Sequence, residues 1–183
     1  METYGWLLDP KKCIECRACE SACKQWNNVE TGVGVRYRRV LVREMGVFPQ
    51  VRMQALSMAC NHCDEAWCMQ VCPTKAIFRR PQDGLVLIDP EKCVGCGLCA
   101  SFCPYRAPQF NTRTRKMEKC TGCYDRIETG LQPACATICP TGALKWGKWS
   151  EISTIGMATT ENFANPNQTK PHIRFVNDPY PVS

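Results

Sequence analysis

Sixteen cysteines stand out in this 183-residue sequence, and their spacing divides them into four groups of four with none left over. Every group opens with two cysteines separated by two residues and closes with two separated by three. Thiolates at this spacing are typical ligands of iron–sulfur clusters, since a C-x2-C-x2-C loop wraps one face of a cubane. The sequence therefore predicts four 4Fe–4S clusters with all sixteen cysteines as iron ligands. In order along the sequence the groups are Cys13, Cys16, Cys19, Cys23; Cys60, Cys63, Cys68, Cys72; Cys93, Cys96, Cys99, Cys103; and Cys120, Cys123, Cys135, Cys139.

The closing cysteine of each group begins the segment that leads away from the loop. In two-cluster ferredoxins this cysteine binds the other cluster of the pair. Proline follows Cys72, Cys103 and Cys139, and it turns the backbone away because its ring fixes φ. Lys24 follows Cys23 instead, so one cluster is expected to have a different turn and more positive charge beside it.

Disulfides and zinc are the alternative uses of so many cysteines. The N-terminus shows no secretory signal, and a protein kept in the reducing cytosol is not expected to form disulfides. Zinc ribbons use two C-x2-C pairs on separate hairpins, which group four alone could imitate. The short spacing in groups one and three brings the pairs too close to share one tetrahedral ion. Clusters are therefore favoured over zinc.

The formal net charge of +6 does not by itself predict nucleic-acid binding. An oxidised cubane with four thiolates carries about −2, so four of them bring the charge to about −2 (+6 − 8). The excess of Lys and Arg is then expected to offset buried anionic clusters. No apolar stretch is long enough to span a membrane, and no complete nucleotide-binding loop is present. The sequence predicts a carrier of electrons with no catalytic site of its own.

An internal repeat sets the expected architecture. Residues 8–13 match residues 88–93 at an offset of 80, and residues 72–77 resemble 139–144. We expect an α+β fold of two ferredoxin-like modules with two clusters each, two-stranded hairpins, and short helices between the third and fourth cysteines of each group. The groups could pair as one with two and three with four, or as one with four and two with three. The 20-residue separation of groups two and three, residues 73–92, favours the second, nested pairing.

The nested pairing assigns the sixteen ligands to four sets. Module A comprises residues 1–24 and 112–150, and module B comprises residues 60–111. Module A is expected to hold the set Cys13, Cys16, Cys19, Cys139 (set 1) and the set Cys120, Cys123, Cys135, Cys23 (set 4). Module B is expected to hold the set Cys60, Cys63, Cys68, Cys103 (set 2) and the set Cys93, Cys96, Cys99, Cys72 (set 3).

Two segments lie outside the modules. The insertion 25–59 is predicted to form a β-hairpin, with an extended strand over 33–43 and its partner over 51–58. The arginines of the first strand are candidates for docking an acidic partner, with a solvated strand face as the alternative: Arg36, Arg38, Arg39 and Arg43. The tail 151–183 has few periodic apolar positions and several prolines, so it is predicted to run extended over a surface.

Specific motifs resemble the iron–sulfur subunit of the dimethyl sulfoxide reductase family of molybdopterin oxidoreductases. The likeness runs from about Tyr4 to Gly147, with a weaker echo at 170–173. It rests on Cys-Asn-His-Cys at 60–63, Cys-Pro-Tyr at 103–105, Ala-Pro-Gln-Phe-Asn at 107–111 and Cys-Thr-Gly-Cys-Tyr-Asp-Arg at 120–126. The resemblance implies four 4Fe–4S clusters in the nested pairing. It also implies a molybdenum- or tungsten-pterin catalytic partner and, commonly, a membrane anchor that exchanges electrons with quinol.

Two other functions remain open from the sequence. A free-standing polyferredoxin would shuttle electrons between soluble enzymes, and a zinc-stabilised module would serve interaction alone. The expected location is a soluble or peripheral membrane complex, either cytoplasmic or periplasmic by co-export with a signal-bearing partner. His62 is expected beside a cluster rather than as a ligand, and His172 is expected to be structural. The cations beside ligands could raise cluster potentials or could be solvated: Lys12, Lys92, Lys119 and Arg126.

Overall fold

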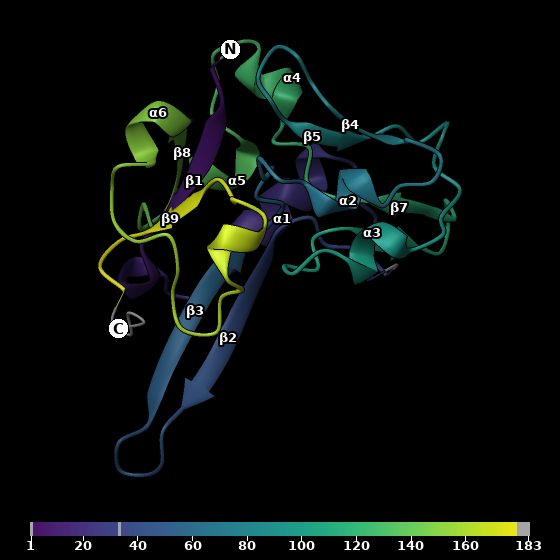
Figure 1. Ribbon diagram of the computed structural model, residues 1–183. Coiled ribbons are helices and arrows are strands. Elements are labelled where there is room, and N and C mark those ends of the chain that lie inside the picture. The colour runs from purple at the N-terminus through teal and green to yellow at the C-terminus, as the bar shows by residue number, and fades with distance from the viewer. Residues whose placement is uncertain (1, 33, 179–183) are drawn as a thin grey trace.

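Short helices and small sheets form the body of the protein, and one long hairpin projects from it (Figure 1). The computed structural model describes residues 2–32 and 34–178. Val33, where the first insertion strand was predicted to begin, and residues 179–183 of the predicted tail lie outside the described residues. The mixture of elements is that of an α+β fold.

A three-stranded sheet joins the two ends of the protein. Strand β1 (Tyr4–Leu8) pairs antiparallel with β8 (Leu144–Lys148) and parallel with β9 (Ile173–Phe175). Trp6 and Leu8 of β1 are fully buried, so the apolar run before group one becomes the centre of this sheet and part of the core. The strand that precedes group one therefore lies beside the strand that follows group four.

Two small hairpins lie in the other part of the body. Strands β4 (Ile77–Arg79) and β5 (Val86–Ile88) pair antiparallel, as do β6 (Gln109–Asn111) and β7 (Lys116–Glu118). The first hairpin joins the segment after group two to the segment before group three. The second crosses the predicted module boundary after residue 111.

Short helices occur between the third and fourth cysteines of each group, as predicted. They are α1 (Ala18–Trp26), α2 (Trp67–Gln70), α3 (Leu98–Ser101) and α5 (Ala134–Thr137). Helix α1 packs against α5, and α2 packs against α3. The remaining helical turns are η1 (Pro10–Lys12), α4 (Tyr124–Ile127), α6 (Trp149–Ile152) and η2 (Pro166–Gln168).

The projecting hairpin consists of β2 (Arg39–Met45) and β3 (Arg52–Met58), paired antiparallel in continuous register (Figure 1). Its tip exposes Val47 and Phe48, which are 81% and 87% accessible. Gly46 begins the tip with a φ of 84°, and a Cβ there would lie 2.3 Å from the Gln50 carbonyl oxygen. Glycine is therefore required where the backbone leaves β2.

The predicted strand over 33–43 was placed too early, because β2 begins only at Arg39. The arginines just before β2 and at its first residue are buried or hydrogen-bonded within the protein. Arg38 is 1% exposed, and Arg39 donates to the carbonyls of Tyr105 and Arg106. A docking role for Arg38 on a strand surface is therefore wrong, since its side chain turns into the core.

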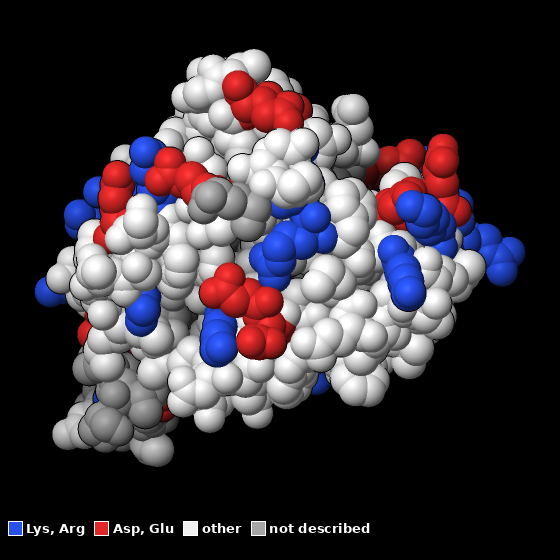
Figure 2. All heavy atoms as spheres, turned by 45° about the horizontal axis from the view of Figure 1, so that its top comes forward, with Lys and Arg blue, Asp and Glu red and all other residues white. Residues whose placement is uncertain are grey.

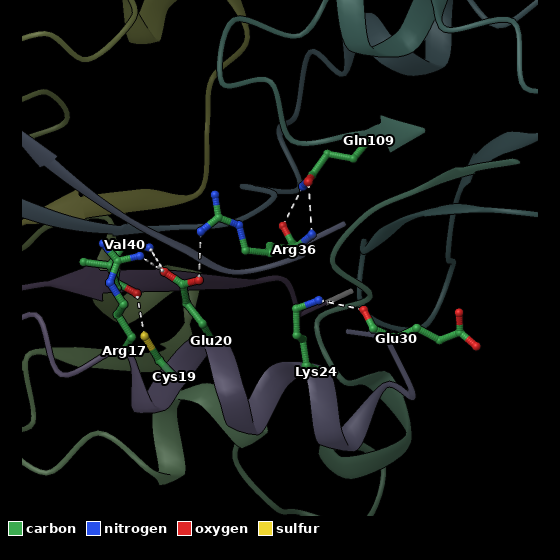
Figure 3. A network of polar contacts seen from close by, with 9 residues as sticks. Arg17, Cys19, Glu20, Lys24, Glu30, Arg36, Val40 and Gln109 are labelled. Carbon is green, nitrogen blue, oxygen red and sulfur yellow. Dashed lines mark hydrogen bonds and ion pairs between the residues drawn. The ribbon is translucent and has the colours of Figure 1, made fainter. Parts of the chain in front are cut away.

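Glu20 fastens the base of the hairpin to α1 (Figure 3). Its buried carboxylate accepts a hydrogen bond from the backbone N–H of Val40 at 2.7 Å and forms ion pairs with Arg17 and Arg36 at 3.4 and 3.3 Å. The Arg36 backbone in turn exchanges two hydrogen bonds with the Gln109 side chain. The hairpin is thus tied to both halves of the body.

The tail differs from the surface-lying segment that was predicted. Strand β9 enters the central sheet, and Ile173 and Phe175 are each 1% exposed. His172 is structural, as expected: its ring stacks on Trp149 at 4.5 Å, and its Nε2 lies 2.9 Å from an Asp64 carboxylate oxygen. The strand has only three residues, so its periodicity gave no strand signal.

Basic and acidic side chains are interspersed on the face of the molecule that Figure 2 shows. Among the residues that the structure describes, no helix is both long enough and apolar enough to cross a membrane.

Candidate metal centres

Three cavities of similar size are each lined by four cysteines. Their empty volumes are 340, 380 and 300 Å³, open solvent included. Each brings three cysteines of one group together with the closing cysteine of another. The linings contain Cys13, Cys16, Cys19 and Cys139 in the first cavity, Cys60, Cys63, Cys68 and Cys103 in the second, and Cys72, Cys93, Cys96 and Cys99 in the third.

The remaining four cysteines also lie close together. Burial raises the pKa of the Cys23 thiol far above its ordinary value, and the neighbouring thiolates of Cys120, Cys135 and Cys123 raise it further. Burial likewise raises the pKa of Cys120 to about 12. The Asn27 amide lies 3.8 Å from the Sγ atoms of both Cys23 and Cys123.

Backbone N–H groups of the cysteine loops, and one from strand β7, donate to sulfur. Gly122 N donates to Cys120 Sγ at 3.3 Å, and Met117 N donates to Cys93 Sγ at 3.4 Å. His62 N and Ala107 N make similar contacts with Cys60 and Cys103. Positive φ angles at several loop positions produce this curvature, among them Glu15, Arg17, His62, Gly95, Gly97 and Gly122. N–H donors around thiolates stabilise their negative charge.

The four sets follow one another in space. Burial raises the pKa of Cys68 to about 12, and the thiolates that add to this effect include Cys60 of its own set and Cys99 of set 3. Cys120 of set 4 also lies close to Cys60 of set 2. Cys19 of set 1 lies close to Cys135 of set 4. The order along the molecule is therefore set 3, set 2, set 4, set 1.

Lys119 is the buried cation between set 2 and set 4. The residue is 4% exposed, and its Nζ donates to Cys60 Sγ at 3.4 Å, to the Cys120 carbonyl at 3.4 Å and to the Val86 carbonyl. Burial acts against its charge, but the surrounding thiolates outweigh burial and raise the pKa of the ammonium. The sequence left Lys119 as a cation that raises a cluster potential or as a solvated lysine; its burial excludes the second, and the effect on potential stays a prediction.

The three other cations that lie next to ligands in the sequence, Lys12, Lys92 and Arg126, are at the surface of the protein. Lys12 and Lys92 are more than half exposed and pair with Asp9 and Asp89. The guanidinium of Arg126 lies over the Trp26 ring at 4.4 Å. Position next to a ligand in the sequence therefore did not distinguish the buried cation from the solvated ones.

Asn61 and His62 complete the buried surroundings of Cys60. The Asn61 side chain lines the set 2 cavity, is 1% exposed, and has no hydrogen-bond partner for its amide nitrogen or oxygen. The ring of His62 accepts from Val86 N through Nδ1 at 3.1 Å, and burial keeps its pKa well below the ordinary value. His62 is therefore neutral and packs beside the site, and its Nδ1 accepts a hydrogen bond from the backbone N–H of Val86.

These features fit 4Fe–4S clusters. Each set offers four thiols from two separate segments, N–H groups donate to sulfur, and the buried cation Lys119 balances negative charge between sets 2 and 4. The unpartnered Asn61 amide at the set 2 cavity fits a site whose acceptors are cluster sulfurs, since buried polar groups are ordinarily paired. Within the described residues, no three His, Cys, Asp or Glu side chains converge closely enough to hold a single metal ion.

Comparisons with known proteins agree with this chemistry. Two family models, both described as a 4Fe-4S dicluster domain, match residues 51–149 and 12–76. The protein is 37% identical to YnfG of Escherichia coli, a probable anaerobic dimethyl sulfoxide reductase component, over 90% of this sequence and 86% of that protein. It is 38% identical to the thiosulfate reductase electron transfer subunit PhsB of Salmonella typhi, over 81% of this sequence and 77% of that protein. It is 40% identical to the protein NrfC of Escherichia coli, over 83% of this sequence and 70% of that protein.

Proposed function

This protein belongs to the iron–sulfur electron-transfer subunits of the dimethyl sulfoxide reductase family, and we propose that it relays single electrons between a molybdenum- or tungsten-pterin catalytic subunit and a second redox partner. It holds four 4Fe–4S clusters on its sixteen cysteines. When bound, these clusters supply one-electron oxidation and reduction. The observation that supports the proposal most directly is the row of four cysteine sets, in the order set 3, set 2, set 4 and set 1. Each set is assembled from two segments of the sequence.

We assign the ligands to the four sets as the nested pairing predicts. The three cysteine-lined cavities support sets 1, 2 and 3, and the mutual effects of the buried thiols support set 4. The pairing of β1 with β8 supports a module that combines residues 1–24 with residues 112–150. The pairing of β4 with β5 supports a second module inserted between them.

Electrons are proposed to enter and leave at the two ends of the row of clusters, which are set 1 and set 3. Cys16 of set 1 and Cys96 of set 3 are exposed, whereas the other cysteines are buried or half-buried. Exposed apolar side chains accompany both, since Ile14 and Val94 are each 64% accessible. Such side chains would be covered by a docked redox partner, which brings its own cofactor close to the end cluster.

The protein's own residues support electron transfer in two ways. Its buried loops direct N–H groups and cations at sulfur, which stabilises the added negative charge of the reduced state. Its short helices carry cysteines of neighbouring sets and pack in pairs, as α1 with α5 and α2 with α3 illustrate. No substrate pocket is needed for this work.

The projecting hairpin is proposed as a docking element for the catalytic subunit. Its tip is apolar and largely accessible at Val47 and Phe48, and Val51 and Met53 nearby are more than half exposed. A free shuttle protein has no use for such a rigidly anchored projection. The complex is proposed to be soluble or peripheral to a membrane, with a membrane anchor as a further subunit, in the cytoplasm or co-exported to the periplasm.

An anaerobic pull-down of the protein from its native cells tests the proposal. Mass spectrometry should find a large partner that contains molybdenum or tungsten, and elemental analysis should find about 16 iron per copy beyond any in the partner. Iron-loaded but solitary protein would favour the free-standing polyferredoxin. Zinc in place of iron would favour the interaction module. Cell fractionation of the same cells would identify the compartment.

A further inference from the structure

Arg38 is a completely buried cation with two unsatisfied donors. The side chain is 1% exposed, and its guanidinium carbon lies 3.9 Å from the centre of the Trp6 ring. Nη1 donates to the Ser57 carbonyl at 2.8 Å. Nε and Nη2 are buried without any hydrogen-bond partner among the described residues. An unpaired buried guanidinium is destabilising unless a negative group compensates it.

The negative groups around Arg38 are cysteines of two different sets. The side chain lies among Cys19 of set 1 and Cys23, Cys120 and Cys135 of set 4. Burial acts against the charge of the guanidinium, but these thiolates outweigh burial and raise its pKa. The guanidinium therefore occupies the junction between two adjacent sites, as Lys119 occupies the junction between sets 2 and 4.

We propose that Arg38 is a potential-setting residue, a permanent positive charge whose Nε and Nη2 donate to sulfur of the two clusters held by sets 1 and 4 and make both easier to reduce. This inference rests on the proposed cluster binding and adds a role for a residue outside the ligand sets. Reduction of a cluster adds one negative charge, so a nearby cation and hydrogen bonds to sulfur both favour the reduced state.

Two neighbours fix the position of the Arg38 side chain. Trp6 covers one face of the guanidinium, and the Ser57 carbonyl holds one end of it. Ser57 Oγ also lies 3.3 Å from Cys19 Sγ, so the same residue contacts both the cation and a ligand of set 1. An arginine remains protonated in proteins, so the charge is constant over the accessible pH range.

A comparison of the four midpoint potentials distinguishes a local effect of Arg38 on two clusters from an effect on all four. Set 3 lies at the end of the row away from Arg38, and its cysteines are not among the groups with the largest effects on Arg38 or Lys119. Loss of the Arg38 charge should therefore lower the midpoint potentials of two clusters and leave the set 3 cluster as an internal reference. A general loosening of the fold would instead affect all four.

An EPR-monitored redox titration of the complete, cluster-loaded protein tests the inference. In Arg38→Gln, two of the four midpoint potentials should fall by at least about 59 mV, which corresponds to a tenfold change in the equilibrium constant for one-electron reduction. In Arg38→Lys, which keeps the charge but cannot place two guanidinium donors, the same two potentials should fall by less. Arg43→Gln removes an equal charge from β2, away from the sites, and should leave all four unchanged.

Several outcomes would overturn the inference. Unchanged potentials in Arg38→Gln, or equal shifts of all four, would contradict it. If Arg38→Gln does not load its clusters, Arg38→Lys decides alone, and unchanged potentials in that variant would contradict it. Iron analysis of the unmodified protein separates this result from a failure of cluster binding itself, because about 16 iron per copy would show that only the role of Arg38 is in error.

Discussion

Lys119 Nζ lies 3.4 Å from Cys60 Sγ, although the two residues are 59 positions apart in the sequence. Lys119 directly precedes Cys120, which we assign to another ligand set. One buried ammonium therefore contacts the surroundings of two neighbouring sites. The structure in this way places a positive charge between the cysteines of two cavities rather than only on the surface.

Replacement of Lys119 by Met should lower the midpoint potential of the set 2 cluster. Two unit charges about 4 Å apart interact by about 4 kcal/mol in a medium of effective dielectric constant about 20, and relaxation reduces the observed effect. We expect a fall of about 50–100 mV, with a smaller fall at set 4. EPR-monitored titration measures it, with Lys92→Met as a control because Lys92 is solvated and pairs with Asp89. A set 2 potential equal in Lys119→Met and in Lys92→Met would contradict the role of the buried charge.

Removal of the Glu20 carboxylate should loosen the hairpin from α1. In Glu20→Ala the buried N–H of Val40 loses its acceptor, and Arg17 and Arg36 lose their ion-pair partner. An unsatisfied buried group of this kind costs about 1–3 kcal/mol. We expect the temperature of cluster bleaching to fall by about 2–12 °C.

Glu44 provides the matched control for that measurement. It lies on the same hairpin, in β2, but is more accessible than the buried Glu20. The variant Glu44→Ala should bleach within about 1–2 °C of the unmodified protein. Equal losses in the two variants would show that Glu20 does not fasten the hairpin.

A charge at the hairpin tip should weaken the complex with the catalytic partner and leave the clusters intact. Phe48 is 87% exposed and touches little of its own protein, so Phe48→Asp should keep the full iron content. A buried interface aromatic contributes about 2 kcal/mol or more, which predicts a dissociation constant at least about 30-fold higher. Binding of the purified partner by surface plasmon resonance measures it. Leu131→Asp changes an exposed apolar residue elsewhere, between α4 and α5, and equal weakening in that variant would contradict docking through the tip.

Gly5 of β1 and Gly147 of β8 lie opposite each other in one sheet, so the effects of a side chain at two crowded positions can be compared directly. A Cβ on Gly5 would lie 2.5 Å from Trp149 Cε3 and 3.0 Å from the His172 carbonyl oxygen, whereas one on Gly147 would lie 3.3 Å from Ile152 Cδ1. Gly5→Ala should cost about 1–3 kcal/mol because the backbone at His172 cannot move freely. Gly147→Ala should cost less, and equal losses in thermal unfolding of the loaded protein would contradict this packing.

The chemistry of the site was predictable from the sequence because cysteine spacing is local. The four groups, the cluster type and the short helix at each third cysteine all follow from residues close together in the sequence. The family match confirms the kind of protein that these spacings indicated. The ligand sets remain a proposal that the cysteine-lined cavities support.

The residues that surround the sites were not predictable in the same way. Arg38 is one of several arginines in a polar stretch, and nothing in that pattern distinguishes the buried one from its neighbours. Strand β9 has only three residues, and it forms because β1 offers a free edge far away in the sequence. Both outcomes depend on long-range contacts that local periodicity does not record.

An anaerobic crystal structure of the loaded protein, with anomalous data at the iron edge, tests the central claim most directly. We predict four compact cubane sites, with Cys23 and Cys120 on one of them and Cys139 and Cys13 on its neighbour. The clusters should follow one another from set 3 through sets 2 and 4 to set 1, with Lys119 between sets 2 and 4 and Arg38 between sets 4 and 1. Cys23 and Cys72 bound to one cubane, or zinc in place of iron, would contradict it.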